Sequence, residues 1–154
     1  MKKLLLFFAG AFFTVFMYAQ SNVEEIDYYQ SIYGMEKKAI VEQFVQPKAE
    51  NRVPFWEVYD AYEVERKELG KQRIILLTDF AEAFPALTNE QADAWMKKVI
   101  SLAKSQDKLI DTYYKKITKA TSPIVGMRFY LLESYLLTAI RYEILDAIPF
   151  PVEE

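Results

Sequence analysis

The sequence of 154 residues contains no cysteine, no histidine and only four glycines. Without cysteine the chain can form neither a disulfide nor a thiolate site, and without histidine it lacks the imidazole of zinc sites and catalytic triads. The Glu-x-x-His motif of di-metal helical bundles is excluded for the same reason. Gly70-Lys71 lacks the upstream glycine and the following serine or threonine of a phosphate-binding loop. We therefore predict a protein that is not an enzyme and that requires no metal or other cofactor.

Residues 1–19 have the composition of a secretory signal peptide. Lys2 and Lys3 precede an apolar run that begins at Leu4, and Ala19 supplies the small residue expected before a cleavage site. A membrane anchor is the alternative interpretation, but the apolar run is about 15 residues long and a bilayer span needs about 20. We therefore expect cleavage after Ala19 and export to the periplasm.

The mature chain would then be a single helical domain formed by residues 20–154. Loss of Lys2 and Lys3 changes the formal charge from −3 to −5. A net negative charge argues against a general nucleic-acid binder. Because the chain has no cysteine to acylate, a lipoprotein anchor is excluded, and we expect no stable membrane anchor after cleavage.

Apolar residues recur every three or four positions through most of the chain, which is typical of helices. The expected helices are residues 33–46, 51–84, 89–119 and 123–147. Only residues 85–87 separate the second helix from the third, and so short a connection forces an antiparallel hairpin. No strand pattern is found. The sequence therefore predicts an all-α fold with four helices, in which a long helical hairpin is accompanied by flanking helices.

The fourth helix is apolar on nearly all sides, as its segment Phe129 to Leu137 illustrates. A helix of this kind should be covered on more than one side. Within one chain the hairpin can cover only one of these sides. The remaining apolar surface indicates a partner subunit or a binding surface.

The third helix opens with a strong start signal. Thr88 is a good N-cap, and Gln91 stands three positions later, which makes a capping box. Leu87 precedes the cap and can pack against Ala92, while Pro85 prevents the preceding helix from continuing. The segment should therefore end one long helix, turn the chain and begin the next.

These turn residues also match a family motif. The segment Leu87-Thr88-Asn89-Glu90-Gln91 resembles the LTxxQ motif of the Spy/CpxP-like family of bacterial envelope proteins. Upstream, Phe55-Trp56-x-x-Tyr59-x-x-Tyr62-Glu63 is similar to an aromatic region of that family, and Arg128-Phe129 through Arg141 resembles its last helix. The resemblance covers residues 33–149. The first LTxxQ motif of the family is absent, and residues 45–50 take its place.

The resemblance implies a function rather than only a fold. It implies a periplasmic, ATP-independent chaperone or an envelope stress-response accessory protein. The family also implies a homodimer with a concave surface for unfolded or partly folded envelope proteins. Two alternatives remain open: a regulatory protein that docks on an envelope stress sensor, and a structural interaction domain without chaperone activity.

The apolar stripe of the second helix supplies the candidate client-binding residues. They are Phe55, Trp56, Tyr59, Tyr62, Arg66 and Arg73. The two arginines interrupt the stripe and could form a cationic spot within a binding face. Alternatively, the aromatic rings pack the core and the arginines form an ion pair inside the bundle, with Glu133 as a possible partner.

A row of lysines follows one face of the third helix. Its members are Lys97, Lys104, Lys108, Lys115 and Lys119. One interpretation is a basic surface for acidic or unfolded clients. The other is an ordinary solvated face, which is favoured by the interspersed Asp107 and Asp111.

Overall fold

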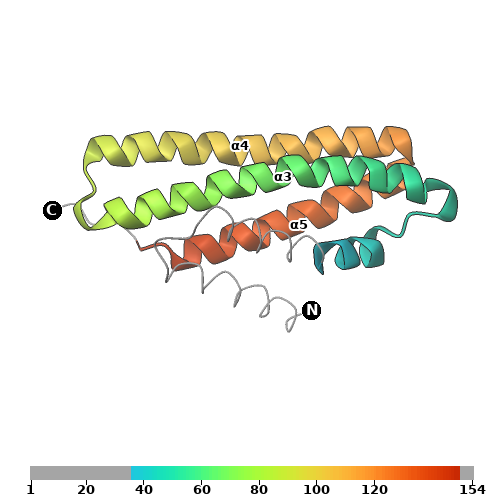
Figure 1. Cartoon of the computed structure of the whole chain (residues 1–154), viewed down its shortest axis with the longest axis horizontal. Helices are drawn as coiled ribbons and strands as arrows, with labels where there is room; N and C mark the ends of the chain where they lie inside the picture. Colours follow the sequence, from blue (N-terminus) through green and yellow to red (C-terminus); the bar gives the residue numbers. More distant parts are fainter. Residues whose placement is uncertain (1–35, 150–154) are drawn as a thin grey trace.

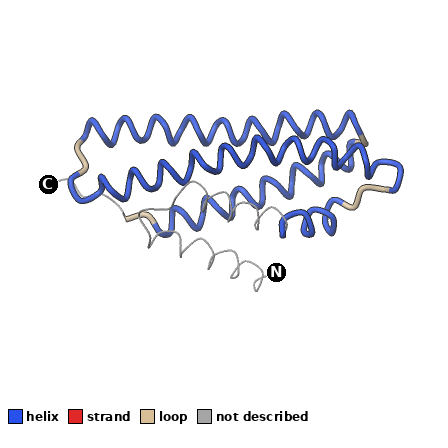
Figure 2. Tube along the Cα trace, viewed as in Figure 1, coloured by secondary structure: helices blue, strands red, loops and turns tan. Residues whose placement is uncertain are grey.

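A computed structural model of the chain describes residues 36–149, and this part is all-α (Figure 1). The expected signal peptide, residues 1–19, lies outside the described residues. The helices are residues 36–45, α3 (Ala49–Ala83), α4 (Asn89–Ala120) and α5 (Pro123–Ala147), and the 3₁₀ turn η2 (Phe84–Ala86) follows α3. Figure 2 shows that short loops join them. None of the described helices combines the length and apolar character that a membrane span needs.

The predicted all-α class and the long antiparallel hairpin are confirmed: α3 and α4 lie side by side along their length (Figure 1). One boundary differs from the prediction. The second helix begins at Ala49 rather than near Asn51, so Pro54 lies in the second turn and removes the bond to the Glu50 carbonyl. The helix still forms because Phe55 and Tyr59, just beyond Pro54, are fully buried and hold this end against the core.

The capping box at the start of α4 is present in full. The Thr88 hydroxyl accepts a hydrogen bond from the Gln91 backbone N–H at 3.2 Å, and the Gln91 side chain accepts one from the Thr88 N–H at 2.9 Å. The Thr88 backbone is extended, as an N-cap residue requires. The turn is further fixed by the Trp95 indole, which donates to the Leu76 carbonyl at 2.8 Å. The family-like motif therefore has a complete structural role.

Replacement of Thr88 by alanine should lower the free energy of unfolding by about 1 kcal/mol, because the N-terminal N–H groups of α4 lose their acceptor. Chemical denaturation of the purified protein measures this change. Thr88→Ser is the matched control and should retain most of the stability, since serine caps equally well. If Thr88→Ala leaves the denaturation midpoint unchanged, the motif is not acting as a cap, and a binding role becomes the better explanation.

The short helix 36–45 packs at the end of the bundle opposite the hairpin turn, beside α3 and α5 (Figure 1). Residues 46–48 connect it to α3, and this short link reverses the chain direction. Gln46 adopts a left-handed backbone with φ of 47°, which is unusual for a residue other than glycine. On α5, Arg128 donates to the Val45 carbonyl at 3.2 Å and ties the helix end to the bundle.

The core lies where helix 36–45, α3, α4 and α5 meet. Its centre is an aromatic group in which the ring centroids of Tyr62 and Phe129 are 5.1 Å apart and those of Tyr62 and Tyr113 are 5.3 Å apart. Such edge-on contacts stabilise buried rings beyond their area burial. The buried residues of α4 lie on one face of the helix: Leu102, Gln106, Leu109, Ile110, Tyr113 and Ile117. This core fixes the side chains of the site described next.

Candidate functional site

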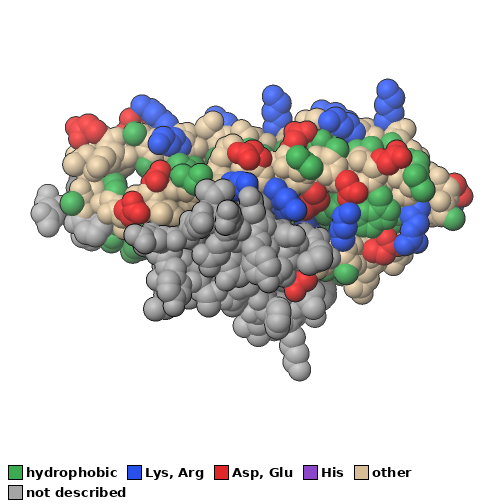
Figure 3. Space-filling view, viewed as in Figure 1, with side chains coloured by type: hydrophobic (Ala, Val, Ile, Leu, Met, Phe, Trp, Pro, Cys, Tyr) green, Lys and Arg blue, Asp and Glu red, His purple; other side chains and the backbone are tan. Residues whose placement is uncertain are grey.

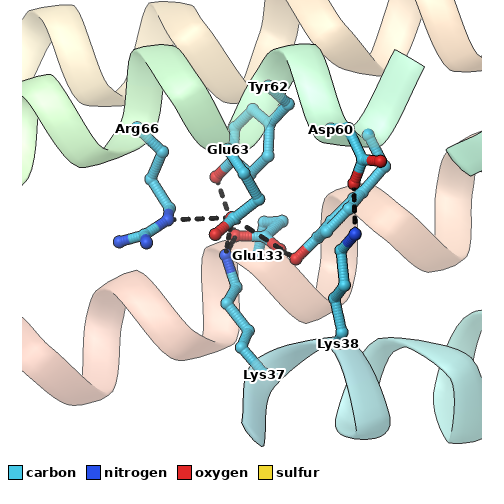
Figure 4. Close-up of polar contacts among 8 residues, drawn as sticks. Lys37, Lys38, Asp60, Tyr62, Glu63, Arg66 and Glu133 are labelled. Atoms are coloured by element: carbon cyan, nitrogen blue, oxygen red, sulfur yellow. Dashed lines mark hydrogen bonds and ion pairs between the residues drawn. The ribbon is translucent and has the colours of Figure 1, made fainter. Parts of the chain in front are cut away.

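A cluster of buried charges joins three helices (Figure 4). The Lys37 amine, from helix 36–45, lies 2.7 Å from Glu63 Oε1 on α3 and 2.7 Å from Glu133 Oε2 on α5. The Lys37 side chain is only 1% exposed. We call this group, with Tyr59, Tyr62 and Arg66, the polar cluster. It connects residues separated by up to 96 positions in the chain.

Two tyrosines and one arginine complete the polar cluster. The Tyr62 hydroxyl donates to Glu133 Oε2 at 2.7 Å, and the Tyr59 hydroxyl lies 3.3 Å from Glu63 Oε1. The Arg66 Nε donates to Glu63 Oε1 at 2.8 Å. The Lys37 amine also lies 5.1 Å from the centre of the Tyr62 ring, within range of a cation–π contact. Every charge in the cluster therefore has a partner of opposite sign or an aromatic neighbour.

Burial and the neighbouring positive charges act in opposite directions on the pKa of Glu63. Burial by itself raises the pKa of Glu63, but the neighbouring Lys37 and Arg66 outweigh it, and the pKa is lowered below its usual value. Glu63 is therefore ionised at neutral pH. Burial, reinforced by the nearby carboxylate of Glu133, raises the pKa values of Tyr59 and Tyr62 well above their usual range. Both phenols therefore remain protonated donors.

The polar cluster is suited to holding helices together. Two cations, Lys37 and Arg66, balance two carboxylates, Glu63 and Glu133, and all four side chains are mostly buried. Within residues 36–149 no group of three acidic side chains is placed to hold a metal ion. Because breaking a buried ion pair strands a charge, the cluster fixes the position of helix 36–45 on the hairpin.

A cavity of about 50 Å³ lies beside the polar cluster, between α3, α4 and α5. Lys37, Arg66 and Arg73 contribute its basic lining, and Leu69, Gly70, Gln106, Leu109, Ile110, Leu137 and Ile140 contribute much of the rest. The two arginines of the candidate site therefore share one lining. The same lining includes Glu133, and Arg66 is paired with Glu63, so carboxylates accompany the basic side chains.

The aromatic members of the candidate client-binding set lie inside the bundle. Phe55, Tyr59 and Tyr62 are at most 2% exposed, and Trp56 is half-buried against them. They pack the core because α3 turns this face toward α5 and helix 36–45. The alternative interpretation, core packing, describes these rings. In this fold Phe55, Tyr59 and Tyr62 offer no surface to a client, and Trp56 offers only part of its ring.

The expected ion pair between Arg66 and Glu133 is replaced by a different arrangement. Glu133 is buried, as that pairing required, but its short hydrogen bonds come from Lys37 and Tyr62, while Arg66 binds Glu63. Sequence reasoning missed Lys37 and Glu63. The available signal was that Lys37 falls one turn before Val41, within the apolar stripe of its helix.

The outer face of α5 carries an exposed apolar stripe. Its residues are Ile124, Met127, Leu131, Tyr135, Tyr142 and Leu145, which are between 51% and 68% exposed. Their spacings of three, four or seven place them on one side of the helix. This α5 stripe agrees with the expectation that the hairpin covers only one side of the fourth helix.

The lysine row of α4 is exposed along its whole length. Lys97 pairs with Asp93 at 2.6 Å and Lys115 pairs with Asp111 at 2.7 Å, both at a helical spacing of four. Figure 3 shows basic side chains projecting from the α4 edge with acidic side chains among them. The mixed charges are those of a solvated helix face, since exposed pairs of this kind contribute little binding or stability.

Comparisons of this chain with protein-family models, with curated proteins and with solved structures found no match.

Proposed function

We propose that the mature protein is a periplasmic, ATP-independent chaperone resembling the Spy/CpxP-like family, and that its client-binding surface is the α5 stripe. The observation that carries this proposal is a row of six large apolar side chains left exposed on one helix face. Exposed apolar patches on a folded protein are typical of binding surfaces. The clients would be unfolded or partly folded envelope proteins.

The α5 stripe can bind such clients by burial alone. Apolar surface removed from water contributes about 25 cal/mol per Å². From Ile124 to Leu145 the helix rises about 30 Å, at 1.5 Å per residue, so an extended client segment could contact several side chains at once. Exposed Arg128 and Glu143 lie on the same helix and can speed the encounter. Binding of this kind requires no nucleotide.

The test is a light-scattering assay with several unrelated aggregating clients. The wild-type protein should suppress aggregation at near-stoichiometric ratios without nucleotide. A triple variant of the stripe, Met127→Gln, Leu131→Gln and Tyr135→Gln, should lose this suppression because it removes the apolar surface. Its folding should change little, since exposed substitutions rarely alter stability by more than about 0.5 kcal/mol each.

The matched control removes three exposed apolar side chains from α3: Val53→Gln, Val64→Gln and Ile75→Gln. These residues are as exposed as the stripe but lie far apart along their helix. The control should suppress aggregation as well as the wild type. If the wild type is inactive, or if both triple variants retain full activity, the α5 stripe is not a client surface.

A second candidate function is docking on one partner, such as an envelope stress sensor. The narrowness of the α5 stripe favours it, because a single row of side chains suits one partner helix. The homodimer implied by the family resemblance could use the same row. Sedimentation of the wild type and of the stripe variant separates these cases: a dimer that the variant converts to a monomer would assign the stripe to self-association.

A further inference from the structure

A second cavity lies near the hairpin turn, between the ends of α3 and α5. Tyr62 of α3 contacts Phe129 and Glu133 of α5, but toward the hairpin turn the two ribbons separate (Figure 1). A cavity of about 280 Å³ occupies this place, and we call it the end cavity. On α3, its lining residues are Leu77, Phe80, Ala81 and Phe84. The end of α5 contributes Ala147, Ile148 and Pro149.

The end cavity has a buried floor and an open mouth. Leu77 and Phe80 are only 8% and 6% exposed, so they form the floor. Ala81, Ala147 and Pro149 are exposed and surround the mouth. A ligand can therefore place one part of itself out of water and keep another part in contact with solvent.

The floor is held in position by α4. The ring centroids of Phe80 and Trp95 are 4.6 Å apart, and the Trp95 indole is fixed by its hydrogen bond to the Leu76 carbonyl. The Phe84 ring lies 5.4 Å from that of Phe80 on the other side. The cavity is therefore bounded by packed aromatic rings and is preformed, as ligand pockets usually are.

Within residues 36–149, every side chain that lines the end cavity is apolar. The lining therefore selects for hydrocarbon and offers a buried polar group no side-chain partner. An apolar cavity of about 150 Å³ can bind benzene. The end cavity is larger, so it has room for two fused rings or a short alkyl chain.

The surroundings of the mouth are negative. Both α3 and α5 reach the cavity with their C-terminal ends, which carry the negative end of the helix dipole. The last turns of α3 and α5 contain no basic residue, whereas the last turn of α4 contains Lys119. Glu143 is exposed and precedes Ala147 by one turn, so it lies on the same side of α5 as the mouth. The chain thus leaves both dipoles to be balanced from outside.

We propose that the end cavity binds a small amphiphilic organic cation, with an aromatic or alkyl group against Phe80 and an ammonium group at the mouth near Glu143. The apolar floor stabilises the hydrocarbon part, and the two helix ends and the carboxylate attract the charge. The faces of Phe80 and Phe84 also favour a cation over an anion. The inference does not depend on the proposed function, which concerns the α5 stripe.

Isothermal titration calorimetry of the full chain tests the charge preference with three probes that share a naphthalene ring: naphthylethylammonium, naphthylethanol and naphthylacetate. The ammonium should bind about 3- to 30-fold more tightly than the alcohol at low ionic strength, which is the gain expected from two helix C-termini. The carboxylate should bind more weakly than the alcohol. Undetectable binding of the ammonium, or equal affinity for all three probes, would overturn the proposal.

Filling the cavity tests the location. Ala81→Trp and, separately, Ala147→Trp place an indole ring in the mouth from α3 and from α5, and each should abolish binding of the ammonium. The matched control Ala61→Trp makes the same change at an exposed alanine of α3 about 30 Å away and should bind like the wild type. Circular dichroism should show the same helix content in all three variants, since the alanines are exposed. Binding that survives both fillings would place the ligand elsewhere.

Two further variants separate charge from apolar contact. Glu143→Gln should lower the affinity for naphthylethylammonium and leave that for naphthylethanol unchanged. The triple variant of the α5 stripe should bind the ammonium as the wild type does. Loss of binding in the triple variant would assign the probe to the α5 stripe and contradict a site in the end cavity.

Discussion

Replacing Lys37 by methionine should lower the free energy of unfolding by about 3–5 kcal/mol, which is the cost of removing one partner from a buried ion pair. Methionine matches the length of the lysine stem but leaves Glu63 and Glu133 without the amine that lies 2.7 Å from each. Arg66 still pairs with Glu63. Glu133 keeps only the hydrogen bond from the uncharged Tyr62 hydroxyl as its short contact. Most of the lost stability should therefore arise from the unpaired charge of Glu133.

The neighbouring residue supplies the control for this prediction. Lys38 pairs with Asp60, but both side chains are about half exposed, so Lys38→Met should cost only about 0–1 kcal/mol. Adding Glu133→Leu to Lys37→Met should recover much of the lost stability, because the stranded carboxylate is removed. Urea denaturation of the four proteins measures these differences. Equal effects of the Lys37 and Lys38 substitutions would show that the polar cluster does not hold helix 36–45 in place.

Replacing Gly126 by alanine should lower the free energy of unfolding by about 1–3 kcal/mol, the usual range for overpacking a close contact. Gly126 is buried in the first turn of α5, where it faces Thr118 of α4. A Cβ at this position would overlap Thr118 Oγ1 and would lie 3.1 Å from Thr118 Cβ. In a helix, alanine is more favourable than glycine by about 1 kcal/mol. The expected loss of stability therefore arises from overpacking, which outweighs the gain in helix propensity.

A double variant separates the packing effect from other causes. Thr118 Oγ1 is buried and makes no hydrogen bond within residues 36–149, so Thr118→Ala alone should change stability little. In that background Gly126→Ala should recover most of the lost stability, because the atom nearest the new methyl group is gone. Thermal unfolding of the four proteins measures the coupling. If the two substitutions are simply additive, the contact between α4 and α5 is looser than the structure describes.

The polar cluster and the α5 stripe differ in exposure: the cluster is mostly buried, and the stripe is exposed. The cluster takes the aromatic face of α3 out of reach of any client, because Tyr59 and Tyr62 are committed to Glu63 and Glu133. The stripe is the apolar surface that this packing leaves outside. A chaperone of this architecture would therefore bind with its fourth helix and use its second helix as a scaffold.

The sequence by itself determined the helices and the hairpin. The start of α4 could be predicted because Thr88 and Gln91 are three residues apart and their bonds form within one turn. The start of α5 at Pro123, after the N-cap Ser122, follows from the same local chemistry. The hairpin followed from a connection too short for any other arrangement.

Only the tertiary structure decided which side chains form the site. Lys37 meets Glu63 across 26 residues and Glu133 across 96, and no local spacing encodes either pairing. The rotation of α3 about its axis turns Phe55, Tyr59 and Tyr62 inward, and the packing of α5 leaves Leu131 and Tyr135 outside. Periodicity shows that a helix has an apolar face, but several faces of α5 are apolar. The choice among them depends on how the helices pack, because the face that buries most against α3 and α4 leaves the others to solvent or to a partner.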